Sequence, residues 1–309
     1  DLIWFPTGGG KTEAYLGLAA FTIFARRVRN KDAHKEGTTI LMRYTLRLLT
    51  TQQFERAASL ILACNEIANL DGGFGGEIGI GLWVGGASTP NTNEQARDAF
   101  SNINQNRYSF VLRKCPCCGA QMGFTDAGVK GLYIHDATQE VRFKCGNRRC
   151  EYHHTDLPIH VVDEQIYDRA PTLVIGTVDK FASIPWNSQR DGHERMSRLF
   201  GFRDGPSRIK PPELIIQDEL HLIAGPLGSM VGMYETLIKE LCTDTGRHEH
   251  PFVPAQGAML PPKIVASSAT ITRAMDQVQG LYGTDRLQIF PPQGLDIGKT
   301  WFSTVDLTP

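Results

Sequence analysis

The sequence of 309 residues lacks a long apolar run, and it carries almost no net charge. No segment approaches the roughly 18 consecutive apolar residues of a membrane-spanning helix, so we expect no contact with a membrane. The formal net charge is −1, which provides no overall field that would draw the chain to nucleic acid or to an anionic membrane. Any surface that binds nucleic acid must therefore be local.

Signals for secretion are also missing. The first residues lead straight into a glycine-rich motif and contain neither a basic segment nor a cleavage pattern, so a signal peptide is not expected. Five of the seven cysteines lie between Cys115 and Cys150, which does not resemble a secreted disulfide framework. We therefore expect a cytoplasmic protein whose clustered cysteines bind metal.

Short apolar segments alternate with helical segments over most of the chain. The sequence predicts helices at 13–28 and 50–69, and strands at 2–5, 38–43, 78–84, 172–175, 214–216 and 263–266. This alternation is typical of an α/β fold in which helices cover both faces of a parallel sheet. The pattern fails between residues 88 and 156. We therefore expect one domain made of residues 1–87 and 157–309, interrupted by an insertion.

A glycine-rich motif joins the first expected strand to the first expected helix. This is the setting of a P-loop, in which backbone N–H groups and the start of a helix bind phosphate. The residues expected to bind ATP are Thr7, Gly8, Gly9, Gly10, Lys11 and Thr12. Lys11 would reach the β- and γ-phosphates, and Thr12 would ligate Mg²⁺. Phe5 stands where the general Walker pattern has a glycine.

Hydrolysis of ATP also requires carboxylates to hold Mg²⁺ and to activate water. Two apolar segments end in Asp-Glu, at residues 163–164 and at residues 218–219. The second pair is preferred because His221 completes an Asp-Glu-x-His motif. We expect Asp218 to bind Mg²⁺ together with Thr12, and Glu219 to act as the general base.

A serine-rich segment follows the strand expected at 263–266. His221 is expected to connect the carboxylates to this loop, and the coupling residues are Ser268, Ala269 and Thr270. If the first carboxylate pair were used instead, Glu164 would be the next candidate for the base.

The cysteine cluster forms two pairs within the insertion. Two tight turns that supply four thiolates are typical of a closed, structural Zn²⁺ site, and the expected ligands are Cys115, Cys118, Cys145 and Cys150. Cys117 lies in the middle of the first turn and is expected to point away. His153 or His154 is an alternative to Cys150, because the second pair has a longer spacing. The nearby basic residues either contact nucleic acid or are simply solvated; they are Arg142, Lys144, Arg148 and Arg149.

Taken in order, these motifs resemble those of a superfamily 2 helicase motor domain of the DExH kind, which has a RecA-like fold. The sequence at residues 4–15 and 217–229 is similar to that of the large helicase subunit of the DISARM anti-phage defence system. The resemblance implies an ATP-dependent helicase or translocase, with DNA as substrate and a partner subunit of the defence system. It also implies which residues contact the nucleic-acid backbone, namely Arg47, Thr50, Gly85, Gly86, Thr177 and Lys180.

Helicases of this kind close their ATP site with a second RecA-like domain, which carries an arginine finger. The chain contains no such domain after residue 270, so we expect residues 1–309 alone to be nearly inactive as an ATPase. A different interpretation remains open at this point: an ATP-sensing, zinc-containing scaffold that binds nucleic acid without unwinding it. The sequence does not separate unwinding from translocation, or DNA from RNA.

Overall fold

The core of the protein is a parallel sheet of eight strands. The computed structural model describes residues 1–4, 10–29, 37–45, 47–70, 76–104, 107–126, 128–184, 193–202, 209–244, 259–268 and 273–292. In spatial order the strands are β12 (Ile289–Phe290), β1 (Leu2–Trp4), β11 (Lys263–Ser268), β10 (Leu214–Gln217), β2 (Ile40–Tyr44), β9 (Leu173–Thr177), β3 (Ile80–Trp83) and β8 (Ile159–His160). All neighbouring strands pair in parallel. The expected parallel sheet is therefore confirmed.

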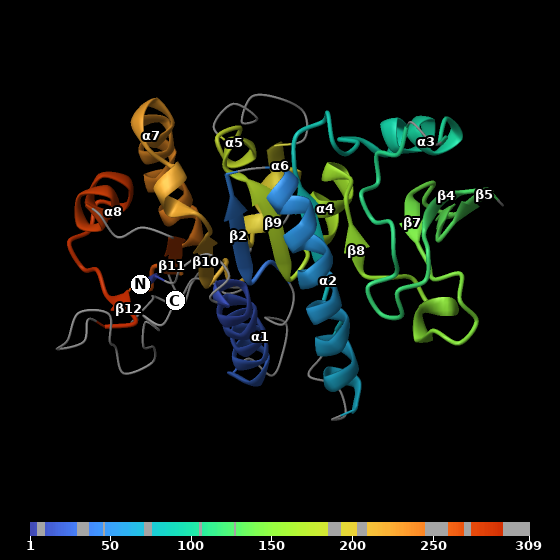
Figure 1. Ribbon diagram of the computed structural model, residues 1–309, viewed down its shortest axis with the longest axis horizontal. Helices are drawn as coiled ribbons and strands as arrows, with labels where there is room; N and C mark the ends of the chain where they lie inside the picture. Colours follow the sequence, from blue (N-terminus) through green and yellow to red (C-terminus); the bar gives the residue numbers. More distant parts are fainter. Residues whose placement is uncertain are drawn as a thin grey trace, which may run out of the picture.

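Helices cover both faces of this sheet (Figure 1). Successive side chains of a strand point to opposite faces, and both sets are buried here. On β2, Ile40 and Met42 join the core beneath α1 (Lys11–Arg29) and α2 (Arg47–Leu70). Leu41 joins the core on the other face, whose helices are α4 (Asp163–Arg169), α5 (Val178–Phe181), α7 (Gly225–Cys242) and α8 (Ala274–Tyr282). Burial on both faces explains why the central strands are almost wholly apolar.

The segment between β3 and β8 departs from the α/β pattern. It begins with α3 (Asn93–Ser101) and continues as two antiparallel hairpins, and the strands are β4 (Gly123–Thr125), β5 (Gly128–Lys130), β6 (Leu132–Ile134) and β7 (Val141–Phe143). In Figure 1 these green elements lie beyond β8, at one edge of the sheet. Their buried residues belong to the same core as α1 and α2, and the Ser59 hydroxyl of α2 donates to the Pro116 carbonyl at 3.0 Å. The segment is thus packed against the domain that contains the parallel sheet.

Several elements were not expected from the sequence. They include the helices α4, α5, α7 and α8, the strand β12 and the short 3₁₀ turns Glu151–His153 and Leu220–Leu222, whereas α6 (His193–Ser197) and the 3₁₀ turn Arg198–Phe200 lie in the arginine-rich segment 186–212, which is typical of a surface loop or a short helix. Most of them are shorter than two helical turns or contain only two strand residues, so no apolar period develops along them. Among the described helices, none has the length and apolar character needed to cross a membrane.

Candidate active site

The order of the strands brings three distant motifs together. β11 lies between β1 and β10, so the ends of these three strands are adjacent, although β1 is more than 200 residues from the other two in sequence. β1 leads toward the glycine-rich motif, β10 leads into Asp218, and β11 ends at Ser268. The carboxyl edge of a parallel sheet is where such folds bind their ligands. Of the glycine-rich motif, the structure describes Gly10, Lys11 and Thr12; Thr7, Gly8 and Gly9 lie outside the described residues.

Asp218 is held in one orientation by donors on both sides of its carboxylate. Its side chain is buried. Oδ1 accepts hydrogen bonds from the Ser267 hydroxyl and, at 3.0 Å, from the Glu219 backbone N–H. Oδ2 accepts a hydrogen bond of 3.1 Å from the Tyr15 hydroxyl, which also lies 3.1 Å from Thr12 Oγ1. A carboxylate and a threonine hydroxyl are ligands that Mg²⁺ prefers, so the oxygens present here suit that ion.

Glu219 lies between a lysine and a histidine. Its Oε1 is 4.0 Å from Lys11 Nζ, and its Oε2 is 3.2 Å from His221 Nδ1. The same histidine nitrogen lies 3.3 Å from the Ser268 hydroxyl, which closes a path from the carboxylate to the end of β11. Ala269 and Thr270, the other two residues of that expected loop, lie outside the described residues. The arrangement places an acid, a cation and an imidazole at one point of the sheet edge.

The backbone at Glu219 adopts an unusual conformation. Its φ of 49° and ψ of 51° fall in the left-handed region, where a residue with a Cβ carries a cost of order 1–3 kcal/mol. The short turn that follows is fixed from outside, because the Gln277 side chain donates to the Leu220 carbonyl at 2.7 Å and to the Ile223 carbonyl at 2.8 Å. Strain maintained by the surrounding structure is common where a side chain must be aimed.

Three residues of this site were not found by sequence reasoning. Tyr15 lies one helical turn after Thr12, and this i,i+3 spacing is the only sequence signal that could have placed it on the same helix face as Thr12. Ser267 was noted only as part of the serine-rich segment. Gln277 carries no sequence signal, because its role depends on α8 packing beside the turn at 220–222.

The residues expected to bind nucleic acid lie at the same edge of the sheet, but they follow the strands β2, β9 and β3 and not β1, β10 and β11. Gly85 and Gly86 follow β3, and a Cβ on Gly86 would come within 2.8 Å of Asn91 Nδ2. Thr177 ends β9, and its side chain is fully buried. Arg47 and Thr50 lie in the first turns of α2, but their side chains fall outside the described part of the chain.

Lys180 is engaged inside the protein. Its ammonium lies 2.5 Å from Asp163 Oδ2 and 3.5 Å from Asn91 Oδ1, and its side chain is only 14 % exposed. Burial raises the pKa of Asp163 to about 6, although the nearby Lys180 opposes that shift. The pair therefore ties the loop after β3 to the starts of α4 and α5.

The other Asp-Glu pair, Asp163 and Glu164, makes contacts within the protein. Glu164 accepts a hydrogen bond of 2.7 Å from the Asn93 backbone N–H. Both acids follow β8, and three strands separate β8 from β10. Asp163 and Glu164 are thus remote from Lys11 and Thr12, and they serve the packing of α4.

We expect Lys180→Met to destabilise the protein by about 3–5 kcal/mol, because it leaves the buried carboxylate of Asp163 without its cation. The added change Asp163→Asn should recover most of this loss. Folding raises the pKa of Asp163 to about 6. The protonated carboxyl therefore stabilises the folded protein at pH values below the pKa of the unfolded chain, and this stabilisation is lost as the pH rises through about 6. The variant should therefore lose less stability at pH 5 than at pH 8, as measured by thermal unfolding. A loss below 0.5 kcal/mol at both pH values would show that Lys180 behaves as an ordinary surface lysine.

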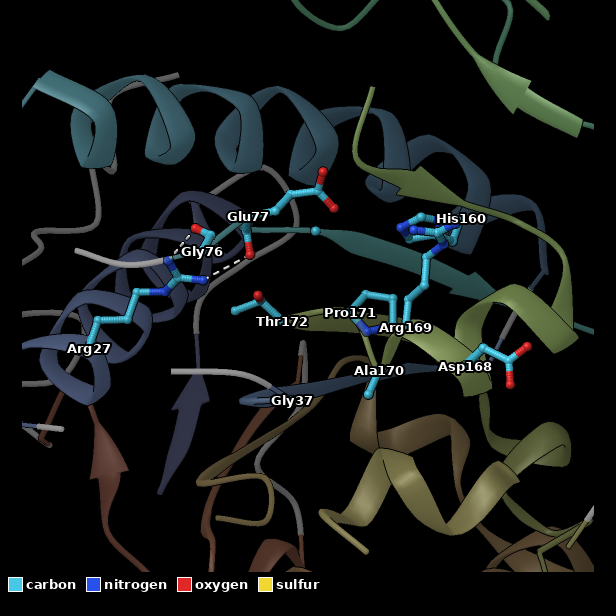
Figure 2. Close-up of a pocket in the computed structure, with 11 residues that line it drawn as sticks. Arg27, Gly37, Gly76, Glu77, His160, Asp168, Arg169, Ala170, Pro171 and Thr172 are labelled. Carbon is cyan, nitrogen blue, oxygen red and sulfur yellow. Dashed lines mark hydrogen bonds between the residues drawn. The ribbon is translucent and has the colours of Figure 1, made fainter. Parts of the chain in front are cut away.

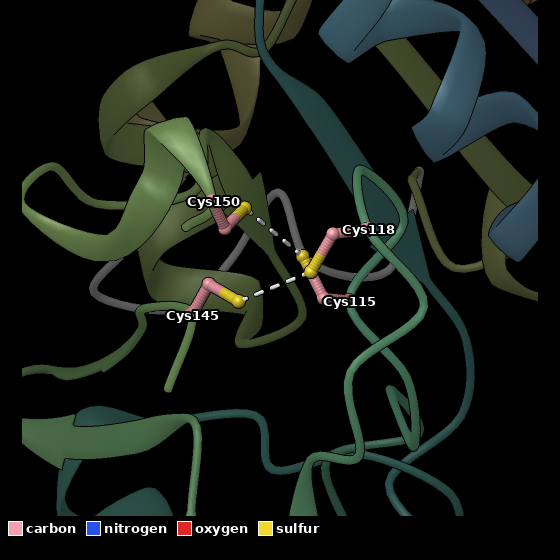
Figure 3. A group of neighbouring side chains, drawn as sticks. All are labelled: Cys115, Cys118, Cys145 and Cys150. Carbon is pink, nitrogen blue, oxygen red and sulfur yellow. Dashed lines mark hydrogen bonds between the residues drawn. The ribbon is translucent and has the colours of Figure 1, made fainter. Parts of the chain in front are cut away.

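The four expected cysteine ligands converge on one point (Figure 3). Their Sγ atoms all lie within 4.8 Å of one another; the separation is 3.9 Å for Cys115 and Cys150 and 3.5 Å for Cys118 and Cys145. Zn–S bonds of about 2.3 Å in a tetrahedron place the sulfurs about 3.8 Å apart. The cluster therefore has the dimensions of a four-thiolate zinc site.

The neighbours of the cluster distinguish the alternatives left by the sequence. Cys117 is exposed and is not one of the converging thiols. His153 Nδ1 lies 3.0 Å from the Cys145 carbonyl, and neither His153 nor His154 belongs to the group of converging ligand atoms. The Asn147 backbone N–H donates to Cys145 Sγ at 3.4 Å, as expected of a turn that presents thiolates. Of the nearby basic residues, Arg142 pairs with Glu140 and Asp156, whereas Arg148 and Arg149 are exposed.

A cavity of about 320 Å³ lies at the opposite ends of the strands (Figure 2). Arg27 donates to the carbonyls of Gly76 and Glu77 along one wall, at 2.9 and 3.0 Å. His160 lines another part, and burial lowers its pKa to about 3, so the imidazole is neutral. None of the expected ATP or metal ligands lines this cavity, which is separate from the candidate active site.

No family model matches the sequence. A search of known proteins finds DISARM protein DrmA of Bacillus paralicheniformis, which is 37% identical over an alignment of 342 residues that includes 98% of this chain. The chain is a relative of DISARM protein DrmA. This confirms the resemblance that the motifs at residues 4–15 and 217–229 indicated. The chain spans 29% of the length of DrmA.

The comparison with solved structures finds helicases at TM-scores below 0.5. The yeast DEAD-box splicing factor Prp28 gives a TM-score of 0.46 at 11% identity, covering 91% of this chain and 39% of Prp28. The DUF1998 helicase MrfA, solved with DNA and AMPPNP, gives a TM-score of 0.30 at 14% identity, covering 91% of this chain and 28% of MrfA.

Proposed function

We propose that this chain is the first motor domain of an ATP-dependent DNA helicase or translocase that acts in anti-phage defence inside a prokaryotic cell. One observation carries the proposal: Asp218 and Ser267 are hydrogen-bonded at the carboxyl ends of two adjacent parallel strands, and the neighbouring Glu219 lies 4.0 Å from Lys11 at the start of α1. The relation to DrmA supports the role in defence.

Each residue of the site would have its own role in phosphoryl transfer. The loop from Thr7 to Gly10 and the ammonium of Lys11 would hold the phosphates, while Thr12 and Asp218 would hold Mg²⁺, which neutralises charge on the phosphates. Glu219 would accept a proton from the attacking water. The buried position of Asp218 limits competition from solvent, and His221 limits the freedom of Glu219.

We assign coupling to the contact between His221 and Ser268, continued by Ala269 and Thr270. A change at the γ-phosphate would alter Glu219, then His221, and then the end of β11. The nucleic-acid backbone would bind along the same edge, at Gly85 and Gly86 and at the first turns of α2 with Arg47 and Thr50. Thr177 and Lys180 belong to that surface in our proposal, but burial and Asp163 restrict both in the present structure.

The proposed domain organisation follows from the same site. Residues 1–87 and 157–309 form the RecA-like ATPase domain, and residues 88–156 form an insertion that we propose to be held by one Zn²⁺. A second RecA-like domain would close the ATP site and supply the arginine finger. DNA and a further subunit of the defence system are the proposed partners.

The test is ATP hydrolysis by the full-length protein, measured without nucleic acid and with single-stranded DNA, duplex DNA or RNA. We expect DNA to stimulate hydrolysis, and residues 1–309 alone to hydrolyse ATP slower by roughly 10³–10⁵, the contribution of an arginine finger. ATP binding without any hydrolysis in the presence of DNA would contradict a motor and favour the ATP-sensing scaffold. Stimulation by RNA alone would change the substrate.

A further inference from the structure

The hydroxyl of Tyr15 lies between the two residues that the proposed function assigns to Mg²⁺. It donates to Asp218 Oδ2 at 3.1 Å, and it lies 3.1 Å from Thr12 Oγ1. The Tyr15 side chain is 1 % exposed, so the phenol has no competing contact with bulk water. Tyr44 stands behind it and donates its own hydroxyl to Tyr15 at 3.4 Å.

The number of protons fixes the direction of these hydrogen bonds. A tyrosine phenol keeps its single proton at neutral pH, because its ordinary pKa is about 10. An ionised carboxylate can only accept, so that proton is given to Asp218. The oxygen of Tyr15 is then an acceptor toward Thr12, and the Thr12 proton points to Tyr15.

This direction has a consequence for a metal ion. A threonine hydroxyl has one proton and two lone pairs, and it binds a cation only through a lone pair. With its proton directed to Tyr15, Thr12 presents its lone pairs elsewhere. Oδ1 of Asp218 is already occupied by Ser267 and by the Glu219 N–H, so Oδ2 is the oxygen that Tyr15 orients.

We propose that Tyr15 is a positioning residue for the Mg²⁺ site: it orients the proton of Thr12 and the carboxylate of Asp218 in a chain of donors from Thr12 to Tyr15 to Asp218. The inference rests on the proposed ATPase function, because it assumes that these two residues ligate Mg²⁺. Partners of metal ligands typically change metal affinity by about 10–100-fold when they are removed.

The test is nucleotide binding by the full-length protein, measured with a fluorescent ADP analogue at increasing Mg²⁺. Tyr15→Phe removes one hydroxyl and keeps the packed ring. We expect its half-saturating Mg²⁺ concentration to rise about 10-fold or more, with ADP affinity in EDTA unchanged. Tyr44→Phe is the matched control, because it removes a hydroxyl of the same kind that contacts Tyr15 and Met42 Sδ but neither metal ligand; it should shift the midpoint less than about 3-fold.

The outcomes separate the two proposals. An unchanged Mg²⁺ midpoint in Tyr15→Phe, beside a wild-type protein whose ADP binding depends on Mg²⁺, would overturn the role of Tyr15 and leave the ATPase proposal standing. Equal shifts in the Tyr15 and Tyr44 variants would likewise overturn it, since packing alone would then explain them. A wild-type protein that bound no nucleotide at any Mg²⁺ concentration would overturn the proposed function, and this inference with it. The melting temperature without nucleotide is measured for each variant.

Discussion

Replacing Glu219 by glutamine is expected to abolish ATP turnover by the full-length protein while leaving ATP binding nearly unchanged. Glutamine has almost the same shape, but it cannot accept the proton of the attacking water. Loss of a general base typically lowers the rate by about 10²–10⁴. The contact of Glu219 with Lys11 is a long one of 4.0 Å, so its loss should not disturb the lysine that we propose to bind phosphate. Steady-state hydrolysis and equilibrium binding of an ATP analogue measure the two effects.

Two further variants give this experiment its controls. Lys11→Ala should weaken ATP binding itself, because it removes the cation at the phosphates. Glu164→Gln changes the same type of residue in the rejected pair, where the carboxylate caps the Asn93 N–H far from Lys11; it should hydrolyse ATP at close to the parent rate. Near-normal turnover in Glu219→Gln together with a large loss of turnover in Glu164→Gln would show that Glu164 is the general base.

Zinc removal is expected to have the largest effect on stability. Purified protein should contain about one Zn²⁺ per chain in this segment, and Cys118→Ser should lose it. Structural zinc sites contribute directly to folding, and loss of a metal is among the few single changes that cost more than about 4–5 kcal/mol. Because Cys115, Cys145 and Cys150 share a core with the residues under α2, the loss should also lower the stability of the domain that contains the parallel sheet. Metal analysis and thermal unfolding measure both.

The matched control for the zinc experiment is the neighbouring residue. Cys117→Ser changes the same atom one position earlier, at an exposed thiol outside the cluster, and it should keep both zinc and stability. His153→Ala tests the other candidate ligand and should also keep zinc. Loss of zinc from the Cys117 variant but not from Cys118→Ser would show that the ligand set is wrong. A protein that is equally stable with and without a strong chelator would contradict a structural metal.

Part of the fold and of the candidate site could be predicted because its signals are local. The alternation of apolar segments indicated a parallel sheet with helices on both faces, since burial on both faces leaves an almost wholly apolar strand. The glycine-rich motif before Lys11 and the Asp-Glu-x-His motif at Asp218 each combine residue types with a spacing that their chemistry requires. Cysteine spacing likewise indicated the four cysteines that Figure 3 shows together. These patterns are written within a few consecutive residues.

The sequence by itself determined the kinds of elements and the residue types of the candidate site; only the tertiary structure decided which of them meet. Apolar periodicity reports that a strand is buried, but it does not report its neighbours. The order β1, β11, β10 therefore had to be seen before Ser267 could be placed on Asp218. The hydrogen bond from Tyr15 to Asp218 likewise joins residues that are distant in sequence. The pairing of Lys180 with Asp163 is set by the packing of their helices. Such contacts depend on the free energy of the whole packed core, which no short segment of sequence specifies.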